Sequence, residues 1–118
     1  MDKNILREDL NFFKAMLESG ENRLKNYSKL IKNKSSKDYK RFIHTYQLLL
    51  LSLSAREKHV LNLIYGVNCN PHTLKEIAKE MELSPSRIRK IRVNAEKKLR
   101  KEMVFLLHPE RRNQKHFL

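Results

Sequence analysis

Apolar residues along most of the chain recur every three or four positions, the spacing of one face of an α-helix. The strongest stripe runs through residues 39–53, in a helix for which Ser36 is the expected N-cap. Weaker stripes predict a first helix, capped by Asp2 or Asn4 and ending at Ser19-Gly20, and a second helix over about residues 21–32. Strand-type alternation is absent, and only two glycines and three prolines occur. The pattern therefore predicts an all-α protein.

Capping sequences divide the second half of the chain into three more helices. Residues 54–57 and 73–76 each have Ser or Thr followed three positions later by Glu, the spacing of a capping box. Ser84-Pro85 places a capping residue before a proline at the first helical position, where a missing N–H does no harm. The helix after residue 54 is expected to end at Tyr65-Gly66, and the last helix to run to His108-Pro109.

The last two of these helices have the form of a helix-turn-helix. Such a motif needs a small residue at the close crossing, here Ala78, and apolar residues in both helices. Glu82 lies in the turn, where glycine would be easier by about 1 kcal/mol if the residue is left-handed. The expected apolar set is Ile77, Met81, Leu83, Ile88 and Ile91. We therefore expect a helical bundle with a C-terminal helix-turn-helix and without winged elements.

A helical wheel separates the last helix into a buried and a basic face. The buried side is expected to hold Ile88, Ile91, Ala95 and Leu99. Residues near the N-terminus of such a helix reach base edges in a major groove, and later cations meet phosphates. The predicted base-reading residues are Pro85, Ser86, Arg89, Lys90 and Val93. Arg89 and Lys90 suit guanine acceptors, whereas Val93 or Pro85 suits a thymine methyl. The predicted phosphate contacts are Thr73 and Ser84 at helix N-termini, with Lys97 and Arg100 later in the last helix.

The charge of the chain agrees with a nucleic-acid partner. The formal net charge is +13 and the pI about 10.1, which favours a polyanion. No stretch approaches the roughly 20 apolar residues of a transmembrane helix, and the first residues lack a signal-peptide core. Cys69 is the only cysteine, so no internal disulfide forms and a reducing compartment fits. We expect a cytoplasmic protein without a membrane partner.

Sequence patterns of metal and catalytic sites are weak. Cys69-x-x-His72 has half the spacing of a zinc site, and no second pair lies at a fitting distance. A glycine-rich phosphate loop and a recognisable catalytic constellation are both absent from the sequence. We therefore expect no metal, no cofactor and no enzymatic activity.

Residues 53–101 carry a set of motifs that are specific in combination. They are Leu53-Ser54-x-Arg56-Glu57, Val60-Leu61, Tyr65-Gly66, Thr73-Leu74-x-Glu76-Ile77-Ala78, Arg87-Ile88-Arg89-x-Ile91 and Ala95-x-Lys97-x-Leu99-Arg100. This order resembles region 4 of bacterial sigma-70-type RNA polymerase sigma factors. LuxR-type regulators open similarly but have fewer residues between Gly66 and Glu76. The resemblance implies binding to a promoter −35 element in double-stranded DNA and docking on the β flap of bacterial RNA polymerase. It also implies phosphate contacts from Arg56, Thr73 and Arg87, and groove contact from Arg89.

The sequence departs from that family at the base-reading positions. Pro85-Ser86 stands where the family commonly has Arg-Glu, and Lys90 where it often has Gln. The usual −35 sequence, a different element and weak sequence preference all remain open. The aromatic domain with which sigma factors melt promoters is not recognisable in residues 1–53, and the chain has no Trp. We therefore expect a DNA-binding transcription regulator or a partial sigma factor that needs a partner to open the promoter. It could be one half of a split sigma, a phage or mobile-element activator, or an excised sigma fragment.

We divide the chain into residues 1–53, a helical region; 54–107, the helix-turn-helix domain; and 108–118, a basic tail. The first region either packs on the second or binds a partner: polymerase, a second sigma-like subunit or another copy of itself. The predicted partner-binding stripe is Tyr39, Phe42, Tyr46, Leu50 and Leu53. Two alternatives of other classes remain: a polymerase-binding inhibitor or adaptor that does not use DNA, and a basic RNA-binding helical protein.

Overall fold

The computed structural model describes residues 7–19 and 29–108. Helix α1 spans Arg7–Ser19, α3 Lys37–Leu48, α4 Ala55–Tyr65, α5 Leu74–Met81 and α6 Pro85–Leu107. The 3-10 turn η1 spans Leu50–Ser52, and residues 29–32 are also helical. All regular structure in these ranges is helical, which confirms the predicted class. The cap expected near residues 2–4, the end of the first helix at Gly20 and the start of the second helix lie outside them.

The capping sequences form the contacts predicted for them. Ser36, Ser54, Thr73 and Ser84 each accept a hydrogen bond from the backbone N–H three residues later. Both capping boxes are complete, with the Glu side chain accepting from the N-cap N–H at 2.8 Å in α4 and 2.7 Å in α5. Gly66 ends α4 in the left-handed conformation, with φ of 71°. Local sequence therefore determines where these helices begin and where α4 ends.

The helix predicted to reach Leu53 ends earlier, at Leu48. The Leu49 N–H donates to Tyr46 O, and η1 continues in the tighter 3-10 form. This change of geometry buries Leu49 and Leu53, whereas Leu51 is 97% exposed. Because η1 contacts both α3 and α6, the turn brings the chain onto α6 before α4 begins.

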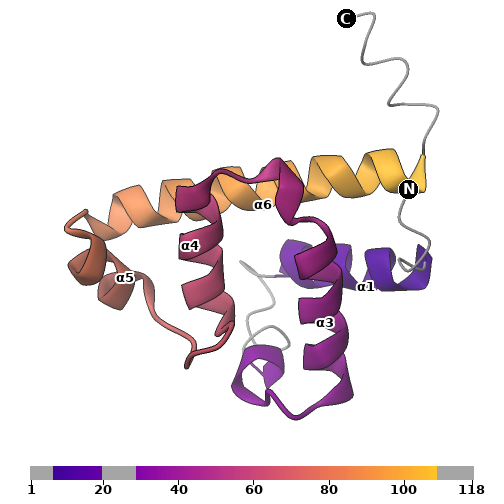
Figure 1. Ribbon diagram of the computed structural model, residues 1–118, viewed down its shortest axis with the longest axis horizontal. Helices are drawn as coiled ribbons and strands as arrows, with labels where there is room; N and C mark the ends of the chain where they lie inside the picture. Colours follow the sequence, from indigo (N-terminus) through magenta and orange to yellow (C-terminus); the bar gives the residue numbers. More distant parts are fainter. Residues whose placement is uncertain (1–6, 20–28, 109–118) are drawn as a thin grey trace, which may run out of the picture.

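Helix α6 runs the length of the molecule, and the other elements pack along one side of it (Figure 1). It contacts α4, α5, η1 and α1, and α1 also contacts α3. One hydrophobic cluster extends from Leu10 in α1 to Leu107 at the end of α6. The N-terminal helices therefore share a core with the helix-turn-helix. None of the helices in the described ranges has the length and apolar character needed to cross a bilayer.

The predicted partner-binding stripe lies inside this core. Tyr39, Phe42, Tyr46 and Leu53 are 0–7% exposed, and Leu50 is half-buried. The rings of Phe42 and Tyr46 each meet Tyr65 edge-on, with centroids 5.1 Å apart. The expectation of a partner-binding surface is therefore wrong for Tyr39, Phe42, Tyr46 and Leu53, which lie in the core of the same chain, and it stays a prediction for the half-buried Leu50.

Candidate nucleic-acid interface

Helices α5 and α6 form the predicted helix-turn-helix. Ile77 and Ala78 on α5 and Ile88 on α6 are buried, and the two helices are in contact. Between them Glu82 adopts a left-handed conformation, with φ of 57° and ψ of 42°. The Leu83 N–H donates to Ala78 O at 2.9 Å, which closes the end of α5 and turns the chain into α6.

The buried side of α6 is the predicted one, and the opposite face is open. Ile88, Ile91, Ala95 and Leu99 are 0–7% exposed. All five residues predicted to read bases lie on the solvent-exposed surface: Pro85, Ser86, Arg89, Lys90 and Val93. Val93 is 44% exposed, which leaves its methyl groups available to a ligand. The structure thus brings the five together along the first half of one helix.

The predicted phosphate contacts lie at the starts of α4, α5 and α6 and further along α6. Arg56, Thr73, Ser84, Arg87 and Lys97 are exposed, whereas Arg100 is half-buried. No carboxylate of the described residues forms an ion pair with Arg87, Arg89, Lys90 or Lys97. Four cations on one helix therefore keep their charge available for an anionic partner.

The capping box at the start of α5 limits what Thr73 can offer a phosphate. Its backbone N–H donates to the Glu76 carboxylate, and its hydroxyl accepts from the Glu76 N–H. These hydrogen bonds with Thr73 lower the pKa of Glu76 below its usual value. Thr73 can still donate its hydroxyl hydrogen to a phosphate. This donor lies beside the Glu76 carboxylate, which stays ionised at neutral pH.

A polar group under α6 was not predicted from the sequence. Glu96 is 8% exposed and lies on the inner side of α6. Its Oε2 accepts from the Tyr65 hydroxyl at 2.5 Å and from Arg92 Nε at 3.3 Å. The spacing of Arg92 and Glu96 suggests their pairing, but the bond to Tyr65 joins residues 31 apart and has no local sequence pattern. Arg92 is therefore held against α6 rather than extended beside the reading face.

A second polar contact, an ion pair, connects α6 to α4. Lys98 Nζ donates to Glu57 Oε1 at 2.9 Å, and the same carboxylate completes the capping box of α4. Burial alone raises the pKa of Glu57, but the hydrogen bonds from Ser54 and Lys98 outweigh it and lower the value. Glu57 therefore stays ionised and fixes the start of α4 on the middle of α6.

The Cys69-x-x-His72 pattern does not develop into a metal site in the described ranges. His72 Nδ1 lies 2.7 Å from Asn70 O, and Cys69 forms no disulfide. The described ranges contain no group of three or more His, Cys, Asp or Glu side chains placed to hold a metal ion.

The comparisons with known proteins match the part of the chain that holds this interface. The family Sigma-70, region 4, matches residues 49–101. The chloroplastic RNA polymerase sigma factor sigD of Arabidopsis thaliana is 47% identical over 58 residues, which cover 48% of this chain and 14% of that protein. The match thus spans about one seventh of the relative's length. No solved structure matches the chain. Residues 49–101 are therefore a sigma-70 region 4 segment, a helix-turn-helix DNA-binding domain.

Proposed function

We propose that this protein is a sigma-type transcription factor that places the first half of α6 in the major groove of a promoter −35-like element. The observation that carries the proposal is the open face of α6, where Arg89 and Lys90 stand beside an exposed Val93. This face follows a helix-turn-helix crossing inside the sigma region 4 segment. An exposed apolar group between unpaired cations suits a groove that presents thymine methyls between base acceptors and phosphates.

The proposed DNA contacts are of two kinds, to bases and to phosphates, and the two kinds come from different positions along the chain. Arg89 and Lys90 donate to guanine N7 and O6, while Val93 or the Pro85 ring meets a thymine methyl. Ser84 and Arg87 at the start of α6 hold phosphates beside the groove, and Thr73 at the start of α5 and Arg56 at the start of α4 hold further phosphates. Lys97 and Arg100 follow one to two turns later and meet a phosphate further along. Because Pro85-Ser86 offers no charged side chain, specificity depends on few positions.

The second part of the proposal is an association with RNA polymerase through its β flap. Leu51 supports it, since this side chain is 97% exposed on η1, within the sigma region 4 segment. We choose Leu51 for substitution rather than Leu50 or Leu53 of the predicted stripe, because Leu53 is buried and Leu50 is half-buried. A partner subunit opens the promoter. The protein works in the compartment that holds the polymerase, and it catalyses no reaction itself.

Selection from a random duplex library followed by affinity measurement tests the DNA part. Arg89→Ala and Lys90→Ala each remove a side chain that donates to a base. Each should weaken binding to the selected site by about 1–3 kcal/mol, or about 5- to 150-fold in Kd. Lys79→Ala removes one exposed charge from α5 and is the matched control, which should weaken binding less than either. Equal effects of all three variants, or no enriched sequence, would show that α6 does not read bases.

Co-purification with polymerase from the native host tests the partner part. The wild-type chain and the Arg89→Ala variant should both retain polymerase, whereas Leu51→Ser should lose it. If no DNA sequence is enriched in the selection and polymerase is still retained, the protein is an adaptor that does not use DNA. Preference for structured RNA over duplex DNA in the same affinity assay would favour the RNA-binding alternative.

A further inference from the structure

The described residues hold a second basic group far from the reading face. Residues 29–41 contain six basic side chains and one acidic. Residues 85–101 of α6 contain eight and one. The other helices are nearly balanced: α1 has two basic and three acidic residues, α4 has two and one, and α5 has two of each. The positive charge of the molecule is therefore concentrated at two places rather than spread evenly.

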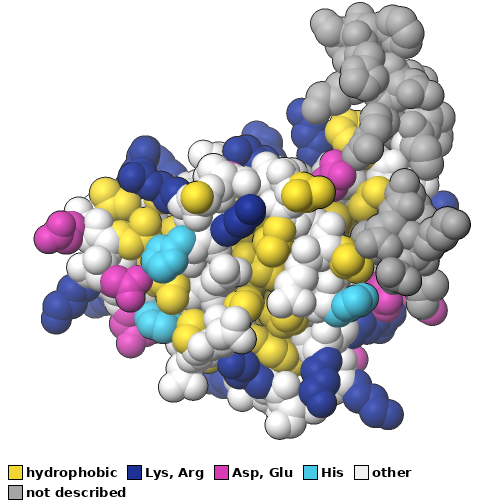
Figure 2. Space-filling view, viewed as in Figure 1, with side chains coloured by type: hydrophobic (Ala, Val, Ile, Leu, Met, Phe, Trp, Pro, Cys, Tyr) yellow, Lys and Arg dark blue, Asp and Glu magenta, His cyan; other side chains and the backbone are white. Residues whose placement is uncertain are grey.

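These two places lie on opposite sides of the fold. Everything that packs on α6 lies on its inner side, and the reading face points outward from that side. Helix α3 begins at the second basic group and runs toward η1, which contacts α6 (Figure 1). At 1.5 Å per residue its 12 residues separate the two ends by about 18 Å. Figure 2 shows Lys and Arg side chains at the lower edge, where Figure 1 places the start of α3.

Four lysines of the second group have uncompensated charge within the described ranges. Lys29, Lys32, Lys37 and Lys40 are exposed, and no carboxylate of the described residues pairs with them. We call these four the lysine corner.

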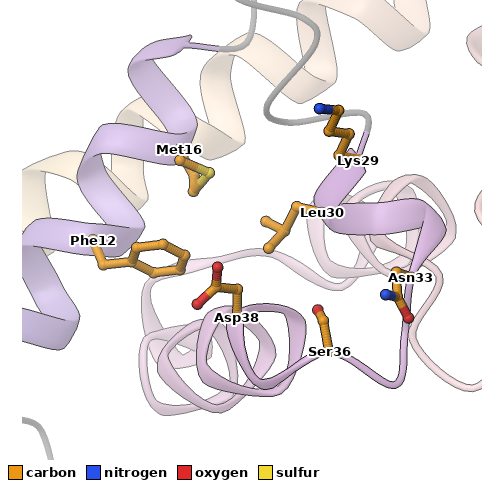
Figure 3. Close-up of a pocket in the computed structure, with 7 residues that line it drawn as sticks. All are labelled: Phe12, Met16, Lys29, Leu30, Asn33, Ser36 and Asp38. Carbon is orange, nitrogen blue, oxygen red and sulfur yellow. The ribbon is translucent and has the colours of Figure 1, made fainter.

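Its two basic neighbours are engaged elsewhere. Arg41 pairs with Asp9 and lies over the Phe12 ring at 4.5 Å, and Lys34 donates to Cys69 O at 2.9 Å. The acidic residue of the group, Asp38, turns toward a pocket of about 340 Å³ that Phe12 and Leu30 help to line (Figure 3). Lys29 lines the same pocket and Asp38 is exposed, so this carboxylate offsets part of the charge, and one carboxylate against four lysines leaves the lysine corner with a net positive charge.

We propose that the lysine corner binds the phosphate backbone of a second segment of duplex DNA while α6 holds the first. Lys29 and Lys32, and likewise Lys37 and Lys40, lie one helical turn apart, so each pair places two ammonium groups on one helix face. Lysine acts on phosphates as a point charge and imposes no base sequence.

The side chains around the corner favour a duplex over a single strand. Tyr39 and Phe42, the aromatic residues of that stretch, are buried and cannot stack on bases, as single-strand binding requires. DNA is also the polyanion already held at high local concentration once α6 is bound, so a neighbouring segment needs only weak affinity. The inference rests on the proposed function, because α6 must occupy the first segment.

A two-duplex capture assay tests the proposal. The selected site is immobilised as a short duplex, loaded with one protein per site and offered a labelled duplex of unrelated sequence at about 50 mM salt. The wild type should capture the second duplex and release it as salt rises. Lys37→Glu with Lys40→Glu should lower capture about tenfold and leave binding to the immobilised site within about threefold. Lys58→Glu with Lys79→Glu, the same change of charge outside both basic surfaces, should capture as the wild type does.

Each other outcome has a definite meaning. Capture that persists in the Lys37/Lys40 variant, or fails in the wild type, overturns the lysine corner as a DNA site. If that variant captures DNA normally but loses polymerase, the corner binds an acidic protein surface, and the proposal is wrong. Light scattering on the loaded protein must show one chain per duplex, since a dimer bridging through two α6 helices also overturns it. A failure of the proposed function is distinguished by a separate measurement: Arg89→Ala would then bind the immobilised site as tightly as the wild type does.

Discussion

Replacing Tyr65 by Phe tests whether α4 supports the DNA-reading helix α6. The substitution keeps the ring, which meets Phe42 and Tyr46 edge-on, and removes the hydroxyl that donates to Glu96. Hydrogen bonds to charged groups contribute about 1.5–3 kcal/mol. Glu96 is 8% exposed, so water replaces the missing donor poorly. We expect the free energy of unfolding to fall by about 2 kcal/mol.

Urea denaturation followed by circular dichroism measures this fall. With a slope of about 2 kcal/mol per molar urea, the midpoint should move down by roughly 1 M without a change of slope. Tyr46→Phe is the matched control, because its hydroxyl donates to the neutral side chain of Asn62 at 2.7 Å. A bond between neutral groups contributes about 1 kcal/mol, so the control should be destabilised about half as much.

A double-mutant cycle with Glu96→Gln assigns the effect to the pair. If the hydroxyl acts on the carboxylate, the two substitutions should be non-additive by more than about 0.5 kcal/mol. Equal destabilisation of the Tyr65 and Tyr46 variants, together with additivity in the cycle, would refute the reasoning. The aromatic stack would then hold α6 by packing alone.

Three further substitutions test the two left-handed turn residues and the ion pair of Glu57. Glu82→Gly should raise the free energy of unfolding by about 1 kcal/mol, since φ is 57° there, and thermal melting checks it. Gly66→Ala should lower it by more than about 1 kcal/mol, because φ is 71° and the new Cβ would lie 2.9 Å from Pro71 Cγ; little change in the same melt would contradict this. The folded pKa of Glu57 lies below its ordinary value of 4.5, because hydrogen bonds from the helix cap and Lys98 outweigh burial. Its contribution to stability is therefore present above pH 4.5 and lost as pH falls through the folded pKa, so melting from pH 7 to 3 should show a steeper acid destabilisation in the wild type than in Glu57→Gln.

The local parts of the structure were predictable because their causes lie within a few residues. The capping boxes at residues 54–57 and 73–76 and the proline after Ser84 determine helix starts through backbone donors three positions away. The buried and exposed faces of α6 follow from its own periodicity. The candidate base-reading residues could therefore be named from sequence, and the structure places all of them on the open face.

What covers the apolar stripe of residues 39–53 depended on the tertiary structure. Periodicity shows that a helix has an apolar face, and the same face suits an intramolecular neighbour or a separate partner. In the fold an intramolecular neighbour packs on this face, because Tyr65 of α4 contacts both Phe42 and Tyr46. The early end of α3 at Leu48 has the same origin, since the chain must reach α6 before α4 starts.

The sequence by itself determined that the protein is helical, strongly basic and equipped with a sigma region 4 segment, since these depend on composition, local capping and motif order. Only the tertiary structure decided which cations are exposed and unpaired, that Glu96 is held by Tyr65, and that the lysine corner lies across the fold from α6. Those features join residues distant in sequence, and their distances are set by how the helices pack.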